Sequence, residues 1–363
     1  MSFADVYPVR IHTVYKDVDK MKTPARILLV LLSVAVVVLL PVLLSSPAMV
    51  TEYAGILQEN YEEALEEEDD EDEEDTEAFC ILDWFISTAR AEEDSDLEEL
   101  TVYELPMDFT VPPVPDPAAY TEDGYEDESI SVKMETLELD GVVYRVARVT
   151  VSSPSQLRTA VVGKPVAKGN NAHVIDIANG NNAIVAINSD FFRNDPDKTS
   201  FEYRQGTKIR ANSNSKKDKL IIDTDGNFHT FFAAKGKPDF PTDRIYQAFT
   251  FGPVLIHEGE LNTDYSKYIS QNSYNTARPE PRTAIGQTGE LSYLLVVAEG
   301  RGESAGATVE QVARFMLDQG CTEAFNLDGG NSCYMVFNNE YYNTLPGAER
   351  SQSDIIYFAT AIQ

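Results

Sequence analysis

The sequence predicts an α+β domain with a mixed, partly parallel sheet flanked by helices, preceded by one transmembrane helix and an acidic disordered linker. Three observations support this prediction. An apolar run occupies residues 27–44, an acidic segment follows it, and residues 129–363 contain apolar strands and an amphipathic helix. We therefore divide the chain into a leader (1–26), a transmembrane helix (27–44), a linker (45–128) and a folded domain (129–363).

Residues 27–44 read ILLVLLSVAVVVLLPVLL and are interrupted only by Ser33 and Pro41. As a helix this run is about 27 Å long, close to the thickness of a hydrocarbon core. The leader carries five Lys and Arg residues, and the first base after the run is Arg90. The positive-inside rule then places the N-terminus in the cytoplasm and the rest of the chain outside. A cleavable signal peptide is the alternative, because small residues follow the run, and the protein is then secreted.

The acidic linker accounts for most of the charge of the protein. The 363 residues carry 60 acids and 29 bases, a net charge of -31, and residues 52–128 hold 30 of the acids and one base. Such a segment repels itself and stays extended. Five prolines between residues 105 and 117 favour a spacer, so we place the domain boundary near 129. No clustered bases are available to bind nucleic acid, which excludes a nucleic-acid partner.

A strand, helix and strand pattern is the main basis for the predicted parallel sheet. Residues 291–298 (LSYLLVVA) form a continuous apolar run that is typical of a strand buried on both faces. The helix that follows starts at a capping box, Thr308 and Gln311, and stops at Gly320. A short strand then leads into the double-glycine turn of TEAFNLDGGNS. A βαβ unit makes the two strands parallel, and their carboxyl ends carry Glu299, Arg301 and Asp328.

A second buried strand is predicted in NAIVAINSDFF, after a short helix in NAHVIDIANGNN. Its carboxyl end carries Asn188 and Asp190. If this strand joins the same sheet in the same direction, Asp190 meets Glu299 and Asp328. Two loops add basic groups, because Arg282 precedes a strand and hairpin and Arg350 precedes the last apolar strand.

Other chemistries find little support in the residues. The four histidines have no metal-ligand spacing, and no P-loop, dinucleotide fingerprint or GxSxG elbow is present. The sequence therefore requires no cofactor, and a divalent cation is possible but unsupported. Residues 223–227 (DTDGN) lack the distal carboxylate of a calcium loop and favour a hairpin turn at Asp225 and Gly226. A disulfide between Cys321 and Cys333 is an open alternative.

Six ordered segments resemble the phosphodiester glycosidases related to the lysosomal uncovering enzyme. They are AINSDFF (186–192), FGPVLI (251–256), PRTAIG (281–286), EGRGESAGATVEQVA (299–313), NLDGGNSCYM (326–335) and ERSQSDIIYF (349–358). Together they span roughly residues 130–363. The resemblance implies hydrolysis of the bond between the anomeric carbon of a sugar and a phosphodiester oxygen.

The chain departs from the family pattern at the glycine turn. The family usually has a third glycine and then small hydroxyl residues, whereas this chain has Asn331, Cys333 and Tyr334. Glu299 stands where the family tends to have Asp. These departures bear on which substrate is accepted, and they leave room for a protein that binds without turnover.

The chemistry of a sugar-1-phosphodiester explains why these residue types matter. Phosphate is a good leaving group, so the site needs carboxylates to activate water or attack the anomeric carbon and to stabilise positive charge on the sugar. It also needs arginines or backbone N–H groups to hold the phosphate. The predicted catalytic residues are Asp190, Glu299 and Asp328. The predicted substrate and phosphate contacts are Asn188, Arg282, Arg301, Gly329, Gly330, Ser332 and Arg350.

Each of these residues also has a purely structural interpretation. Asp328 can cap its own turn and Asp190 can end a strand. Glu299 can form an ion pair, Asn188 can cap a backbone, and Arg350 can form a salt bridge. The sequence therefore predicts an extracytoplasmic, membrane-anchored hydrolase that acts on a sugar-phosphate or cell-surface glycan. The alternatives are a noncatalytic glycan-binding or phosphoglycan-binding module, or an exopolysaccharide or spore-envelope assembly factor; the oligomeric state is open.

Overall fold

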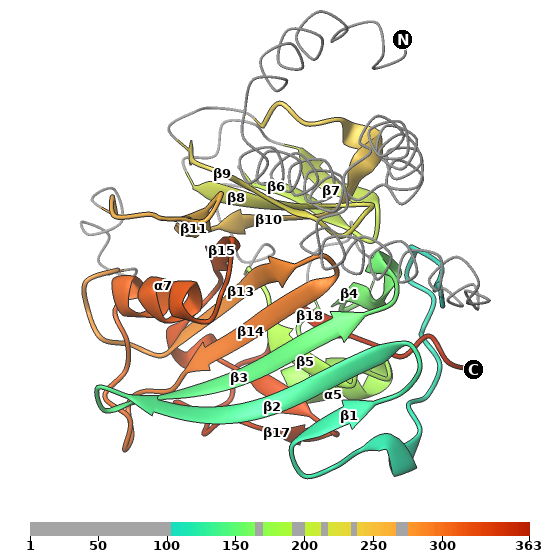
Figure 1. Cartoon of the computed structure of the whole chain (residues 1–363), viewed down its shortest axis with the longest axis horizontal. Coiled ribbons are helices and arrows are strands. Elements are labelled where there is room, and N and C mark those ends of the chain that lie inside the picture. The colour runs from blue at the N-terminus through green and yellow to red at the C-terminus, as the bar shows by residue number, and fades with distance from the viewer. Residues whose placement is uncertain (1–102, 164–169, 191–199, 212–216, 234–237, 266–274) are drawn as a thin grey trace, which may run out of the picture. The chain divides into compact units, whose positions relative to one another are not determined.

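The computed structural model describes residues 103–163, 170–190, 200–211, 217–233, 238–265 and 275–363 (Figure 1). The predicted leader, transmembrane helix and most of the acidic linker lie outside these residues. Within the described ranges, no helix is both long and apolar enough to cross a bilayer.

Three antiparallel sheets make up the described domain. The eight-stranded sheet has the order β1 (Gly124–Glu126), β2 (Ile130–Leu139), β3 (Val142–Val151), β14 (Ser292–Ala298), β13 (Arg282–Gly289), β15 (Glu323–Asn326), β11 (Val254–His257) and β12 (Glu260–Leu261). A five-stranded sheet has the order β17 (Glu340–Tyr341), β16 (Met335–Phe337), β5 (Val185–Asn188), β18 (Asp354–Phe358) and β4 (Leu157–Val161). The other five-stranded sheet has the order β7 (Thr207–Ala211), β6 (Phe201–Arg204), β10 (Ile245–Phe251), β8 (Asp218–Asp223) and β9 (Phe228–Phe231).

In the part of the chain that the structure describes, six short helical segments accompany these strands. Two are α-helices, α5 (Val174–Gly180) and α7 (Val309–Asp318). Four are 3-10 turns, η2 (Pro117–Ala119), η3 (Pro154–Gln156), η6 (Thr242–Arg244) and η7 (Gly330–Ser332). The capping box of Thr308 and Gln311 at the start of α7 is confirmed, as is the hairpin between β8 and β9.

The predicted mixed, partly parallel sheet is wrong. The strands β14 and β15 and the helix between them exist, but β13 lies between the two strands and pairs antiparallel with both. The strands β14 and β15 therefore run in the same direction, but they are not neighbours in the sheet. The strand β5 is not in this sheet at all, and its partners β16 and β18 are also antiparallel to it.

Burial on both faces explains why the strand pattern was misleading. Leu295 and Val297 of β14 belong to the core between the sheets, whereas Leu294 and Val296 face α7. An antiparallel sheet covered on both sides has the same continuous apolar run as a parallel one. The run therefore predicts coverage of both faces but not the direction of the neighbouring strands.

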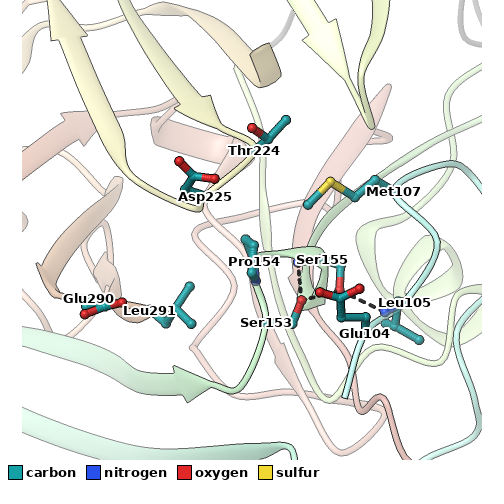
Figure 2. A pocket seen from close by; sticks show the side chains of 10 residues that line it. All are labelled: Glu104, Leu105, Met107, Ser153, Pro154, Ser155, Thr224, Asp225, Glu290 and Leu291. Atoms are coloured by element: carbon teal, nitrogen blue, oxygen red, sulfur yellow. Dashed lines mark hydrogen bonds between the residues drawn. The ribbon is translucent and has the colours of Figure 1, made fainter. Parts of the chain in front are cut away.

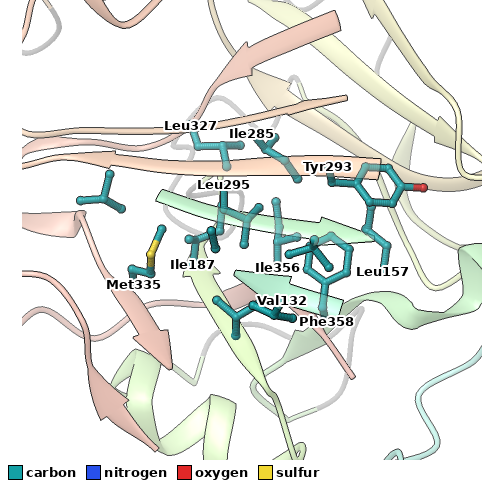
Figure 3. Close-up of a cluster of buried hydrophobic side chains, with 14 of the residues drawn as sticks. Val132, Leu157, Ile187, Ile285, Tyr293, Leu295, Leu327, Met335, Ile356 and Phe358 are labelled. Carbon is teal, nitrogen blue, oxygen red and sulfur yellow. The ribbon is translucent and has the colours of Figure 1, made fainter. Parts of the chain in front are cut away.

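The main core lies between the eight-stranded sheet and the sheet that contains β5 (Figure 3). Val132 and Leu295 come from one side, and Ile187 and Ile356 from the other. The helix α7 packs on the outer face of the first sheet, and α5 packs on the outer face of the second. Both helices are too short to be stable on their own, so their apolar contacts with the sheets stabilise them.

Two buried thiols lie in different parts of this core. Cys321 belongs to the cluster under α7 and Cys333 to the cluster between the sheets, and both are free. The disulfide that the sequence left open is therefore absent. Burial raises the pKa of each thiol to about 12, so neither is a reactive thiolate at neutral pH.

Described residues that precede position 129 also contact the sheets. The strand β1 pairs with β2. The proline-rich segment is fastened by the fully buried Arg158, whose guanidinium donates to the carbonyls of Pro106 (2.9 Å), Asp108 (2.7 Å) and Thr110 (2.8 Å). Prolines leave their carbonyls free as acceptors, so an extended segment can still be bound tightly.

Replacing Arg158 with Met is expected to release this segment. The variant leaves several carbonyls without a charged donor, and we expect a loss of about 3 kcal/mol in the free energy of unfolding. Urea denaturation measures that loss, and limited proteolysis should show new cleavage between residues 103 and 118. The control is Arg314→Met, which removes an exposed i,i+4 pair with Glu310 and should cost under about 0.5 kcal/mol. Equal losses in the two variants would show that the segment is only loosely attached.

Candidate functional site

The candidate site is the double-glycine turn that follows β15. The Asp328 N–H lies 3.3 Å from the Ser189 carbonyl oxygen, and the Asn188 Nδ2 donates to the Asp328 carbonyl at 2.8 Å. The chain thus brings the ends of β5 and β15 together, although the two strands lie in different sheets.

Close packing explains the glycines of the turn. A Cβ atom at Gly329 would lie 2.9 Å from the Pro281 carbonyl oxygen, which is closer than real contacts allow. Gly330 has a φ of +63° and donates its N–H to the same carbonyl at 2.9 Å. The left-handed conformation favours glycine. The two glycines therefore let the turn press against the segment just before β13, and Gly329 N–H also donates to Asp328 Oδ1 at 2.9 Å.

The carboxyl of Asp328 is the site group with the most perturbed protonation. Burial raises its pKa to about 6, while Ser332, the Gly329 N–H and the charges of Arg350 and Lys217 act in the opposite direction. The Ser332 hydroxyl is fully buried beside this carboxyl, yet its Oγ has no partner of hydrogen-bond geometry among the described residues. A carboxyl that titrates near neutral pH can accept or donate a proton during a reaction.

Asn188 contributes to the shape of the site rather than to its surface. It is fully buried, and its Oδ1 accepts from the Thr283 Oγ1 at 2.8 Å and from the Tyr334 N–H at 3.1 Å. Its amide therefore joins β5, β13 and both sides of the glycine turn. All its polar atoms are used, which leaves none for the sugar hydroxyls that we predicted it to bind.

Asp190 is bound in a buried ion-pair cluster. Its Oδ1 lies 2.6 Å from Nη2 of Arg204, and its Oδ2 accepts from the Thr250 N–H at 2.9 Å. Arg204 also contacts Asp354 at 2.9 Å and Glu202 at 3.1 Å, and the side chains of all four residues are at most 1% exposed. Burial raises the pKa of Glu202 well above its ordinary value and raises that of Asp354. Asp190 is thus close to Asp328 along the backbone, but its carboxyl belongs to this cluster.

Glu299 has the structural role that the sequence left open. Its Oε1 accepts from the Arg145 Nε and from the Thr344 N–H, both at 2.7 Å. The ion pair that the sequence left open for Glu299 forms with Arg145 on β3. No contact in the described residues joins the Glu299 carboxylate to Asp328.

The three predicted arginines differ in what binds them. Arg282 is buried beside Gly329, and its guanidinium donates to the backbone carbonyls of Asn275, Arg278 and Ala307. Arg301 lies over Gly330 and binds Glu280 at 2.6 Å. Arg350 is exposed, and within the described ranges its guanidinium has no ion-pair partner. Arg350 is therefore the predicted arginine best placed to receive an anionic group.

Sequence reasoning missed Lys217, whose charge also acts on Asp328. Its Nζ lies 5.3 Å from the centre of the Phe251 ring, at the end of β10. The available signal was the basic run SKKDK (215–219) directly before an apolar strand. A basic group at the start of β8 can reach the site only because β8 and β10 pair there.

A pocket of about 400 Å³ lies elsewhere, between the start of the described chain, η3 and two hairpin turns (Figure 2). Its lining includes the carboxyl groups of Glu104, Asp225 and Glu290. None of the predicted site residues lines it, and its acidic lining does not suit a phosphate. In the described part of the chain, no three His, Cys, Asp or Glu side chains gather as metal ligands.

Residues 181–359, which include the glycine turn, match the family model described as phosphodiester glycosidase. The predicted resemblance to this family is confirmed.

Individual relatives are distant. A SPbeta prophage-derived uncharacterized protein, YomE of Bacillus subtilis, is 24% identical over 193 residues, which are 52% of this chain and 29% of that protein. The chain thus matches less than a third of that relative. The catalytic domain of zebrafish N-acetylglucosamine-1-phosphodiester alpha-N-acetylglucosaminidase, auto-inhibited by its pro-peptide, has a TM-score of 0.51 and 18% identity, covering 64% of this chain and 83% of that domain. At this identity the likeness shows a shared fold.

Proposed function

We propose that the domain hydrolyses a sugar-1-phosphodiester at the anomeric C–O bond, with Asp328 as the essential carboxylate. The observation that carries the proposal is the carboxyl of Asp328, whose pKa is raised to about 6 on a glycine turn close to the charges of Arg350 and Lys217. The match of residues 181–359 to the phosphodiester glycosidase family model supports the reaction class. N-acetylglucosamine-1-phosphodiesters are the substrate class that we test first.

In the proposed reaction, water adds to the anomeric carbon and the bond from that carbon to the phosphodiester oxygen breaks. The bonding electrons leave with the phosphate, and the ionised Asp328 either takes a proton from the attacking water or attacks the carbon itself. In the second course a glycosyl ester forms on Asp328, and water then hydrolyses that ester to release the sugar and restore the carboxyl group. Arg350 and Lys217 stabilise the charge that remains on the phosphate. In either course the ionised carboxylate is the active form. The leaving phosphate needs little help from a general acid, so one free carboxylate is sufficient.

The location of this activity is also part of the proposal. We infer that the domain acts outside the cytoplasm, because the apolar run at 27–44 follows a basic leader and the positive-inside rule then places the domain outside. A membrane-anchored domain of this kind has cell-surface glycans or glycan phosphates within reach.

The test is an incubation of the full chain with UDP-N-acetylglucosamine or an alkyl N-acetylglucosamine-1-phosphodiester, followed by measurement of free sugar. Because the ionised Asp328 is the active form, kcat/KM is expected to rise about tenfold per pH unit below its pKa and to level off above about pH 6. Release of no sugar from either compound would contradict the proposal. Binding without release would then identify the noncatalytic glycan-binding alternative, which is consistent with the occupied carboxylates of Asp190 and Glu299.

A further inference from the structure

Two residues that depart from the family pattern connect the two sides of the candidate site. Tyr334 is fully buried, and its hydroxyl donates to the Asn331 carbonyl at 2.8 Å and accepts from the Arg350 N–H at 2.6 Å. One hydroxyl thus bridges the glycine turn and the loop that carries Arg350. A small hydroxyl residue at position 334 has no ring to span this distance.

The side chain of Asn331 makes a second bridge. Its Oδ1 accepts from Nη1 of Arg301, and a Cβ atom at Gly347 would lie 3.5 Å from the same oxygen. Arg301 in turn binds Glu280 through its Nε at 2.7 Å. A glycine at position 331 would provide no side chain for the contact with Arg301. Asn331 therefore ties Arg301 to the turn, and its side chain lies next to the backbone of Gly347 in the loop that carries Arg350.

We propose that Tyr334 and Asn331 are positioning residues that hold residues 344–350 against the glycine turn and thereby set the Arg350 guanidinium beside Asp328 to receive the substrate phosphate. This inference rests on the proposed function, since it assigns the phosphate to Arg350. Arg282 and Arg301 are occupied by backbone carbonyls and by Glu280, respectively. The positioning acts through the backbone of Arg350 and leaves its guanidinium available.

Other contacts keep the loop folded when the Tyr334 hydroxyl is removed. The Thr344 N–H donates to Glu299 at 2.7 Å, and the Tyr341 hydroxyl donates to Glu349. Tyr334→Phe is therefore a mild variant that shifts Arg350 without unfolding the loop. Asn331→Gly is a second variant, because it removes the other bridge and restores the family residue.

The experiment measures the pKa of Asp328 in the full chain from its carboxyl carbon chemical shift, assigned by the signal lost in Asp328→Asn. Arg350→Ala is expected to raise that pKa, because a cation that favours the ionised form is gone. Tyr334→Phe and Asn331→Gly should raise it in the same direction, and Tyr334→Phe combined with Arg350→Ala should shift it no further than Arg350→Ala alone. For hydrolysis, we expect KM to rise about tenfold in Arg350→Ala and about threefold in Tyr334→Phe, with kcat nearly unchanged.

The control is Tyr342→Phe, whose hydroxyl lies 3.3 Å from Thr136 Oγ1 and should affect neither the pKa nor KM. The inference is overturned if Arg350→Ala raises the pKa while both positioning variants leave it unchanged. It is also overturned if the shifts of Tyr334→Phe and Arg350→Ala simply add. A parent protein that hydrolyses nothing would defeat the proposed function alone, because the titrations still decide whether Tyr334 and Asn331 position Arg350.

Discussion

Asp328→Asn is expected to abolish hydrolysis and at the same time to stabilise the protein at pH 8. Among the predicted catalytic residues, Asp328 has the carboxylate that is not held in an ion pair, and its loss should lower kcat by about a thousandfold or more. The amide oxygen of Asn can still accept the Gly329 N–H, so the turn should keep its shape. Binding of the substrate should survive, because the phosphate contacts remain.

The gain in stability follows from the raised pKa of Asp328. Burial lifts that pKa from 3.8 to about 6 in the folded protein, so the folded state binds a proton more tightly than the unfolded state. The free energy of unfolding therefore falls as the pH rises from about 4 to about 6, and the whole penalty is present above pH 6. Allowing for solvent screening of a half-buried group, asparagine should recover about 2 kcal/mol at pH 8.

Thermal unfolding at pH 4 and pH 8 tests this expectation. The variant should unfold at a higher temperature than the parent at pH 8, and the difference should shrink towards pH 4. The matched control is Asp225→Asn in the exposed hairpin turn, where the side chain is 65% exposed and no stabilisation is expected. Unchanged hydrolysis, together with unchanged or reduced stability at pH 8, would show that Asp328 only caps its turn.

Arg204→Met is expected to have the largest effect on stability. The guanidinium contacts Asp190, Glu202 and Asp354, and none of these four side chains is more than 1% exposed. Removal of one partner from a buried ion-pair cluster costs about 3–5 kcal/mol, because the remaining charges are left uncompensated. The strands β5, β6 and β18 lose their shared contact, so the loss should appear in global unfolding.

The pH dependence of this variant has a definite sign. The pKa values of Glu202 and Asp354 are already raised by burial and by the neighbouring carboxylates, and loss of Arg204 should raise them further. Such groups bind protons more tightly in the folded state, so the loss of stability should be greater at pH 8 than at pH 5.5. Urea denaturation at the two pH values measures this.

A half-exposed arginine provides the control for Arg204. Arg244 binds Asp223 at 2.9 Å and Asp225 at 2.6 Å and has a side chain that is 47% exposed, so Arg244→Met should cost about 1 kcal/mol or less. Addition of Glu202→Gln to Arg204→Met should recover part of the stability by removing one buried acid. Equal losses for the two arginine variants would contradict the proposed importance of the buried cluster.

Local pattern was sufficient for most individual elements of the fold. Apolar runs located β5 and β14, the capping box of Thr308 located the start of α7, and the DG pair located the turn between β8 and β9. The apolar pattern did not predict the relative direction of neighbouring strands, because β13 lies between β14 and β15 and pairs antiparallel with both. Which strand lies next to which depends on contacts between distant residues, and apolar periodicity records only which faces are buried.

The candidate site shows the same division. The sequence located the glycine turn and the carboxylates and arginines around it, but not their partners. Asp190 binds Arg204, and Glu299 binds Arg145, 154 residues away in the chain. These ion pairs occupy the carboxylates of Asp190 and Glu299, whereas the carboxyl of Asp328 has no ion-pair partner among the described residues. The sequence shows which side chains can carry a charge, whereas the tertiary structure determines which opposite charge lies next to each of them.

From the sequence alone we could infer apolar strands covered on both faces, a double-glycine turn after one of them, and a resemblance to the phosphodiester glycosidase family. Tertiary contacts determine that the sheets are antiparallel and that Asp190 and Glu299 are held in ion pairs. They also determine that Arg282 and Arg301 bind other protein groups, whereas the Arg350 guanidinium has no ion-pair partner among the described residues. The physical reason is that side-chain type and local periodicity are properties of neighbouring residues, whereas burial, pairing and protonation arise where distant segments meet.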